Sequence, residues 1–173
     1  MKFLPPRKYQ PAANRLFDEL KIKIEKAVPY ARVEHIGSSS IAGAVSKGDL
    51  DIYAGVEAAR MKETIPLIEA LGFKIKSDSC RIAELCPFEA RGHTIDVGLQ
   101  LVTRGSRFEF FLKFRDIMNS NKKLRDEYNL LKRDSAGLNQ EDYRKIKSVF
   151  IERVLSCCKF IEMSWFAFFR NVM

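Results

Sequence analysis

Residues 49–56 alternate between two sets of side chains, which is the two-residue period of a β-strand. The first set is apolar throughout and consists of Leu50, Ile52, Ala54 and Val56. The second set begins with two carboxylates, those of Asp49 and Asp51. The segment therefore predicts a strand that presents two neighbouring acidic side chains on one face.

The segments around this strand predict a mixed sheet with helices. Apolar residues at helical spacing predict helices over 9–28, 57–71, 108–119, 122–135 and 141–158, and a short helix over 41–46 that Ser39 or Ser40 caps. Further strands are expected over 32–37, 73–76, 80–86 and 93–102, with hairpin turns around Asp78 and 89–92. The fold class is thus α/β, in the α+β arrangement: a mixed β-sheet flanked by helices, with a helical C-terminal portion.

The length and the net charge of the chain limit its possible functions. A chain of 173 residues, 46% of them apolar, fits one domain with a core. Lys and Arg outnumber Asp and Glu by 30 to 22, and a net charge of +8 favours anionic partners such as nucleotides, nucleic acid or an acidic membrane surface. The alternative is that these charges only solvate helix faces. Four cysteines without metal-ligand spacing, and an N-terminus without an apolar signal core, favour a cytoplasmic protein with free thiols and no zinc site.

The last residues form a distinct segment. Residues 160–173 are apolar and aromatic, but they are too few for a membrane span of about 20 residues. We expect a terminal helix that packs on a domain formed by residues 1–159. The sharper alternative is a helix that binds a protein partner.

Three acids predict a metal site. Two carboxylates on one strand face repel each other unless a cation lies between them, and their oxygens suit magnesium (Mg2+) or manganese (Mn2+). Asp96, in the expected strand 93–102, would add a third ligand from a neighbouring strand to Asp49 and Asp51. Taken by itself, an Asp-x-Asp spacing is also typical of a solvated strand face.

An anion site is expected beside these acids. Gly37 ends the strand 32–37 and lets the backbone approach a ligand closely. Ser38 and Ser39 can offer hydroxyl and amide donors to a phosphate, and Lys47 can add a positive charge. The simpler alternative is that Gly37 makes a turn, the serines cap a helix and Lys47 is solvated.

The segment Val33–Gly43, VEHIGSSSIAG, resembles the signature of the GrpB-like family, a branch of the nucleotidyltransferase superfamily that includes DNA polymerase β. The superfamily pattern is a strand, Gly-Ser, a spacer and two acids that flank one apolar residue, followed by a third acid on a later strand. The C-terminal half is similar to the same family in three elements: Phe114-Arg115-Asp116, Tyr128 with Lys132, and Tyr143 with Lys147. The resemblance spans residues 9–155 and departs from the family pattern at Ala42 and Gly48, where members often carry proline.

The resemblance implies a nucleotidyltransferase fold and a metal-dependent enzyme that transfers a nucleoside monophosphate from a nucleoside triphosphate (NTP) to an unknown acceptor. Asp49 and Asp51 would then hold the metals, and Asp96 would help to activate the acceptor hydroxyl. Gly37 and Ser38 would bind the phosphates. Two alternatives remain: a non-catalytic accessory or nucleotide-binding module that assists a partner protein, and an RNA-binding protein, although the sequence lacks RRM and KH signatures.

Three further residues are secondary candidates. His35 precedes the Gly-Ser pair and could contact a phosphate or transfer a proton, although such a residue is more often structural. Arg81 and Arg115 could clamp a phosphate, although a salt bridge with a nearby acid is the simpler interpretation for each.

Overall fold

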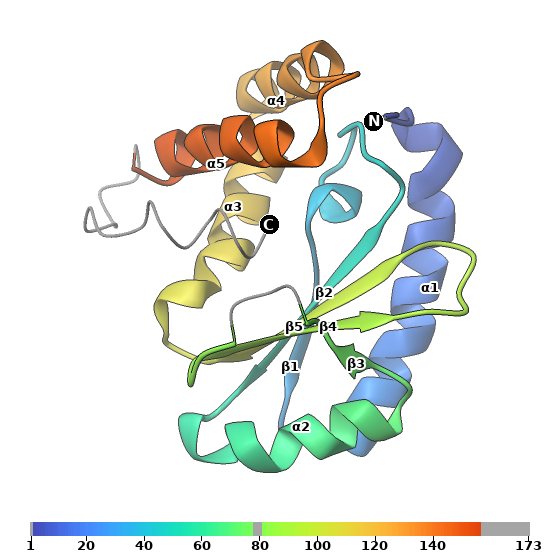
Figure 1. The fold of residues 1–173 in the computed structure, drawn as a ribbon, viewed down its shortest axis with the longest axis vertical. Helices are drawn as coiled ribbons and strands as arrows, with labels where there is room; N and C mark the ends of the chain where they lie inside the picture. The colour runs from blue at the N-terminus through green and yellow to red at the C-terminus, as the bar shows by residue number, and fades with distance from the viewer. Residues whose placement is uncertain (1, 78–80, 157–173) are drawn as a thin grey trace.

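A five-stranded mixed sheet runs through the centre of the structure, a computed structural model that describes residues 2–77 and 81–156. The strands lie in the order β1-β2-β5-β4-β3 (Figure 1). β2 and β5 are parallel, and every other neighbouring pair is antiparallel, which confirms the predicted mixed sheet. The strands are β1 Arg32–Ile36, β2 Leu50–Val56, β3 Lys74–Ile75, β4 Leu85–Ala90 and β5 Val97–Thr103.

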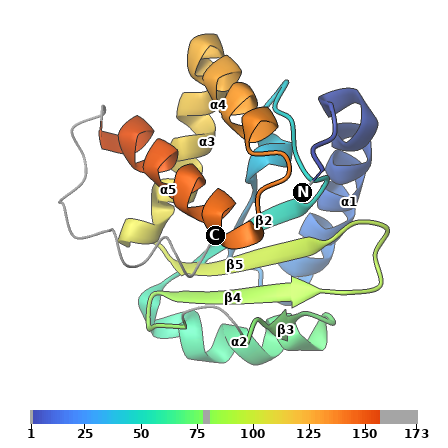
Figure 2. The ribbon, with the colours of Figure 1, turned by 45° about the horizontal axis from the view of Figure 1, so that its top comes forward.

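Helices cover both faces of this sheet. α1 and α2 lie on one face, and α3, α4 and α5 lie on the other (Figures 1 and 2). The α-helices of the described chain are α1 Pro6–Ala27, α2 Met61–Ala70, α3 Phe110–Ser120, α4 Lys122–Asp134 and α5 Gln140–Ser156. They confirm the five long helices that the periodicity predicts, apart from residues 157 and 158, which lie outside the described residues together with the expected segment 160–173. No described helix is long and apolar enough to cross a membrane.

The two sheet faces form two hydrophobic cores. The apolar set of β2, with Leu50 and Ile52, packs into the core on the side of α1 and α2. Tyr53, on the other face of β2, joins the core formed with α3, α4 and α5. Because both faces of β2 are covered, the acids at its start lie at the border of the second core rather than on an open surface.

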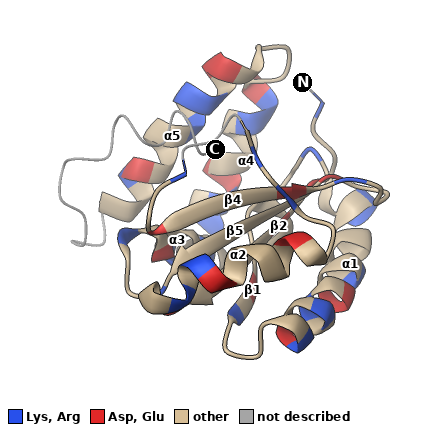
Figure 3. Cartoon of the chain, turned by 60° about the horizontal axis from the view of Figure 1, so that its bottom comes forward, with Lys and Arg blue, Asp and Glu red and all other residues tan. Residues whose placement is uncertain are grey.

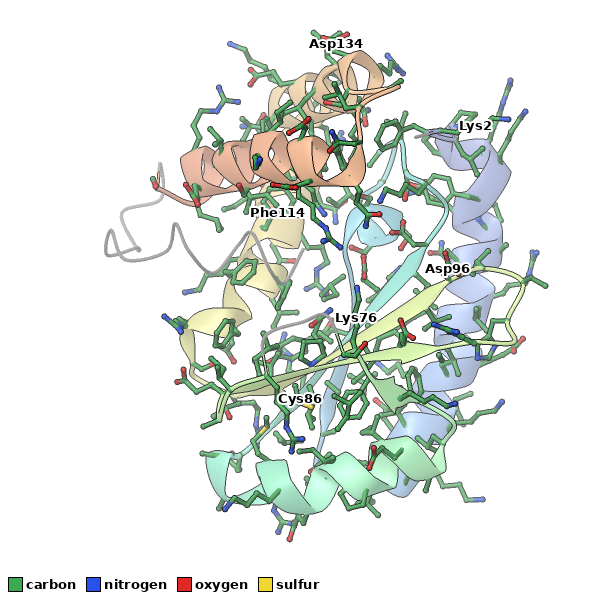
Figure 4. All side chains as sticks on the ribbon, viewed as in Figure 1. Lys2, Lys76, Cys86, Asp96, Phe114 and Asp134 are labelled. Carbon is green, nitrogen blue, oxygen red and sulfur yellow. The ribbon has the colours of Figure 1, made fainter. Side chains whose placement is uncertain are left out.

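Strand register brings the sequence-predicted acids to one edge of the sheet. Leu50 and Val97, the first residues of the parallel strands β2 and β5, are direct partners. The backbone N–H of Leu50 also donates to the carbonyl of Asp96 at 2.9 Å, so Asp96 lies beside the start of β2 (Figure 4). β1 runs the opposite way, and its last residue, Ile36, pairs with Asp51. The Gly-Ser pair after β1 therefore meets the acids at this edge.

Three local predictions are wrong. The helix expected over 41–46 is absent; a single 3-10 turn occupies Ser38–Ser40, and Ser46 instead forms a β-bridge with Leu4. The strand expected over 80–86 is β4, which begins at Leu85 and continues past Pro87 to Ala90. The strand expected over 93–102 begins only at Val97, so Asp96 precedes β5 instead of lying inside it. The turn expected around Asp78 lies outside the described residues.

Candidate functional site

A cavity of about 1270 Å3 opens at this edge, between the sheet and the C-terminal helices. Its sheet side includes Gly37, Asp49 and Asp51, and its helix side includes residues of α4 and α5. Tyr128 and Lys132 of α4 and Tyr143, Arg144 and Lys147 of α5 all line it. The two Tyr/Lys pairs that resemble GrpB elements thus face the acidic pair across one cavity.

The carboxylate of Asp51 lies between two glycines. A Cβ atom placed on Gly37 would be 2.2 Å from Oδ2 of Asp51, and one placed on Gly98 would be 3.1 Å from Oδ1. Gly37 also has a φ of +71°, a backbone conformation that residues with a side chain rarely adopt. Residue 37 therefore needs to be glycine for the carboxylate to occupy this place, and at residue 98 a side chain would make a tight contact with the carboxylate.

The pKa of Asp51 is raised from 3.8 to about 6. Burial is the main cause, because it disfavours the charged form, and the neighbouring carboxylate of Asp49 raises the pKa further. Lys147, Lys76 and Lys47 lower it in part. Lys76 directly follows β3 and lines the cavity; Figure 4 labels it. The carboxylate of Asp49 therefore acts against ionisation of Asp51, and the lysines around the cavity partly offset this effect.

The acids fit a metal that a nucleotide brings with it. Asp49 accepts a hydrogen bond from Ser46 Oγ at 2.8 Å, and neither Asp49 nor Asp51 forms a salt bridge with any described residue. Asp96 is exposed and lines the same cavity. Residues 2–77 and 81–156 contain no group of three acids, histidines or cysteines close enough to hold a metal by themselves. Magnesium commonly takes only one or two protein carboxylates and completes its shell with substrate phosphates and water.

Lys132 is a buried cation at the Gly-Ser turn. Its side chain is 1% exposed and donates hydrogen bonds to Ser38 Oγ and to the Val45 carbonyl, both at 2.6 Å. Its ammonium also lies 4.0 Å from the centre of the Tyr128 ring. Burial lowers the pKa of Lys132 well below its usual value, and the charge of Lys147 lowers it further. Lys132 therefore joins α4 to Ser38 and Val45 of the loop that follows β1.

Other cations surround the cavity. Lys47 lines it, with Nζ 5.5 Å from the centre of the Tyr143 ring. The Nε atom of Arg144 is buried and has no hydrogen-bond partner in the described part of the chain. On α1, by contrast, basic and acidic residues are interspersed (Figure 3), as expected for a solvated helix face. The cations of the cavity are thus a distinct set that suits an anionic ligand.

Side chains from three helices hold the loop 37–46, which follows β1. Asn129 of α4 accepts from the Val45 N–H at 2.8 Å and donates to the Gly43 carbonyl at 2.9 Å. Asn119 of α3 makes the equivalent pair with Ala42 N–H and the Ser40 carbonyl. Tyr9 and Gln10 of α1 donate to four carbonyls of the loop: those of Ser38, Ala44, Ser39 and Ile41. These bonds replace helical ones, which explains why residues 41–46 form no helix.

His35, Ser39 and Arg81 lie away from the cavity, although the sequence placed them in the site. His35 stacks on Phe17 of α1 at 4.8 Å between ring centres, and its Nε2 is 2.9 Å from Ser39 Oγ. Burial lowers the pKa of His35 to about 4, so the ring is neutral at pH 7. His35 and Ser39 line a separate cavity of about 340 Å3 on the side of α1. Arg81 is exposed and is not part of either lining.

Arg115 has the simpler of its two predicted roles. Its guanidinium contacts Glu34 Oε2 at 2.9 Å and the His35 carbonyl at 3.0 Å, and it also pairs with Asp116. Arg115 therefore anchors α3 to β1 beside the Gly-Ser turn.

Sequence reasoning did not identify several residues of the site. Gly98, Lys76, Gln100 and Arg144 line the cavity, and none belongs to a motif singled out in the sequence. Lys132 and Lys147 carried a signal, because each follows a tyrosine by four residues and shares its helix face. The four-residue spacing alone does not predict whether that helix face lies opposite the acids.

Comparison with known proteins identifies the family. A model of the GrpB protein family matches residues 7–156. The chain belongs to the GrpB family. Relatives include a UPF0157 protein of Vibrio cholerae, 44% identical over 90% of this chain and 82% of that protein, and a UPF0157 protein of Halalkalibacterium halodurans, 31% identical over 80% of this chain and 71% of that protein.

Solved structures share the fold of this GrpB protein. GrpB from Enterococcus faecalis is 20% identical and superimposes with a TM-score of 0.72, covering 92% of this chain and all of that chain. A cytoplasmic RNA terminal U-transferase gives a TM-score of 0.55 at 14% identity, over 75% of this chain and 40% of that chain. Cid1 poly(U) polymerase with Mg 3′-dATP bound gives 0.54 at 14% identity, over 73% and 41%. The GrpB fold is therefore a nucleotidyltransferase-like fold, as the resemblance implied. This chain spans about two fifths of the length of the two transferases.

Proposed function

We propose that this GrpB protein transfers a nucleoside monophosphate from an NTP to the hydroxyl group of an acceptor, with Mg2+ or Mn2+ as cofactor. One observation carries the proposal. The paired carboxylates of Asp49 and Asp51 line a cavity that also contains several cations, and Gly37 of the Gly-Ser turn lies against the carboxylate of Asp51. Structural neighbours described as bound to Mg 3′-dATP and to MgGTP support this class of substrate.

The phosphates would bind on the helix side of the cavity. The hydroxyl of Ser38, the ammonium groups of Lys132 and Lys147, and the unpaired Nε of Arg144 are donors with the right charge. Lys47 adds positive charge near the opening. A triphosphate bound there would balance the positive charge of these side chains.

Asp49 and Asp51 would hold the metal together with phosphate oxygens, and Asp96, which precedes β5 and lines the same cavity, would lie beside the acceptor hydroxyl. The metal would neutralise charge that develops on the phosphates during transfer. The ionised form of Asp51 is needed for this role, and its pKa of about 6 leaves it ionised at pH 7.

The transfer needs no covalent enzyme intermediate. The acceptor oxygen forms a bond to the α-phosphorus, and the bond from this phosphorus to the oxygen that bridges to the β-phosphate breaks. Pyrophosphate leaves, and the hydroxyl proton goes to Asp96, which the cavity leaves exposed to solvent. The chain contributes position and charge, which are the main sources of rate in phosphoryl transfer.

A thermal-shift measurement tests the proposal. The melting temperature is measured with an NTP, with Mg2+, and with both. We expect the pair to raise it by several degrees in the wild type and not in Asp51→Asn, because a ligand stabilises only the state it binds. Asp134→Asn is the control, since this exposed acid at the end of α4 does not line the cavity (Figure 4).

The opposite result has a clear meaning. If no NTP with Mg2+ or Mn2+ stabilises the wild type, the transferase proposal is wrong and the accessory-module alternative gains support. A protein partner that binds through residues 160–173 would fit that alternative, but this segment lies outside the described residues.

A further inference from the structure

Gln100 of β5 lines the cavity, and its side-chain amide contains a buried oxygen that is unpaired among the described residues. Its Oε1 atom is buried and accepts no hydrogen bond, and its amide nitrogen donates none within the described residues. An unpaired buried amide oxygen is costly, so such groups usually have a partner in the working state of a protein. Gln100 takes no part in the metal or phosphate binding proposed above.

Strand geometry fixes where this amide lies. Gln100 is two residues beyond Gly98 on β5, and Gly98 is the direct partner of Asp51. Alternate residues of a strand share a face, so Gln100 is on the face of the acids and about 7 Å further into the sheet. Gln100 therefore lies further from the Gly37-Ser38 turn than Asp51 does, because its partner Tyr53 pairs with Glu34 whereas Asp51 pairs with Ile36.

Part of the wall of this cavity is aromatic. Phe110, Phe111 and Phe114 of α3 line the same cavity, and the adjoining rings of Phe110 and Phe111 have centres 4.2 Å apart. Flat apolar walls with one polar group at the end suit a planar heterocycle that forms hydrogen bonds along its edge.

We propose that Gln100 recognises the nucleobase of the NTP by hydrogen bonds to its edge. This inference rests on the proposed function, because it needs a nucleotide with its α-phosphate at Asp51. A glutamine amide offers one acceptor and one donor side by side, and a base edge with an adjacent donor and acceptor matches it. The cavity, at about 1270 Å3, leaves room for an acceptor molecule beside the nucleotide.

Exchange of the amide for a carboxylate gives a directional test. Glutamate accepts two hydrogen bonds and donates none when ionised, and the Watson–Crick edge of guanine offers two adjacent donors. We expect Gln100→Glu to shift the ranking of ATP, GTP, CTP and UTP towards GTP by roughly tenfold in relative affinity. Affinities are measured by calorimetric titration of each NTP in the presence of Mg2+.

Two further variants separate recognition from packing. Gln100→Asn keeps the amide on a shorter stem, so binding should weaken while the order of the four nucleotides stays the same. Gln140→Leu is the matched control: Gln140 also lines the cavity but is exposed at the start of α5, and its loss should leave the ranking unchanged.

The outcomes are distinguishable. If no nucleotide binds the wild type, the proposed function fails and this inference fails with it. If nucleotides bind the wild type through Asp51 but Gln100→Glu keeps the wild-type ranking, only the role of Gln100 is overturned. If Gln140→Leu changes the ranking as much as Gln100→Glu does, recognition does not depend on the buried amide, and the inference is also overturned.

Discussion

The carboxylate of Asp51 lies so close to Gly37 that a single methyl group on residue 37 would be 2.2 Å from Oδ2. This distance is shorter than any real contact between a Cβ and an oxygen atom. The turn after β1 and the acid at the start of β2 therefore occupy their places jointly. Neither can change without moving the other, which joins the expected phosphate-binding turn to the expected metal ligand.

Gly37→Ala should displace Asp51 and destabilise the fold. The substitution adds a backbone cost at a φ of +71° and the contact with the carboxylate. Gly43→Ala is the control, because Gly43 has a φ of +81° but no atom within 4 Å of an added Cβ. We expect Gly37→Ala to lower the free energy of unfolding by about 1 kcal/mol or more beyond Gly43→Ala in urea titrations. Equal losses in the two variants would contradict this account.

Asp51→Asn should stabilise the protein without metal at high pH. The folded-state pKa of about 6 exceeds the usual 3.8, so the folded state binds the proton more tightly than the unfolded state does. The free energy of unfolding therefore falls as pH rises from about 4 through 6, and the loss persists above 6. Asp51→Asn should remove this loss, on the order of 2 kcal/mol at pH 8 and little at pH 4. Denaturant titrations at both pH values measure it, with Asp134→Asn as a variant that should follow the wild-type profile.

Lys132→Met should weaken NTP binding more than it harms the fold. The substitution keeps an apolar stem in the buried space and removes the charge that contacts Ser38. We expect at least a tenfold loss of affinity for an NTP with Mg2+, measured by calorimetry. Lys123→Met, on the exposed face of the same helix, should bind as the wild type does. Similar affinities in the two variants would show that Lys132 is only a structural cation.

Asn129→Ala should loosen the loop that carries the Gly-Ser turn. Its amide satisfies both Val45 N–H and the Gly43 carbonyl, and the first of these bonds is buried. Loss of both partners should cost about 1–3 kcal/mol of unfolding free energy. Asn14→Ala, at an exposed position of α1, should cost little or even stabilise the helix. Hydrogen exchange of the amides in loop 37–46 gives a second measurement, and unchanged exchange in Asn129→Ala would oppose this role.

The part of the site that the sequence predicts correctly depends on short-range rules. A two-residue period places Asp49 and Asp51 on one face, and a glycine directly after a strand predicts a tight turn. Both rules act within a few residues, so the strand 50–56 and the turn at Gly37 appear where expected.

The rest of the site depends on contacts between distant segments. Gly98 meets Asp51 only because β2 and β5 pair in one particular parallel register. Residues 41–46 form no helix because side chains of α1, α3 and α4, far away in the sequence, take their backbone hydrogen bonds. His35 was assigned to the site because it adjoins the Gly-Ser pair, but its position along β1 turns it towards Phe17 on the other face.

Manganese binding tests the central claim most directly. Free Mn2+ is measured by its electron paramagnetic resonance signal while the protein is titrated in the presence of a non-hydrolysable NTP analogue. The account predicts that the wild type removes Mn2+ from solution together with the analogue, and that Asp49→Asn and Asp51→Asn do not. Equal Mn2+ binding by the wild type and Asp51→Asn, or none by the wild type, would contradict it.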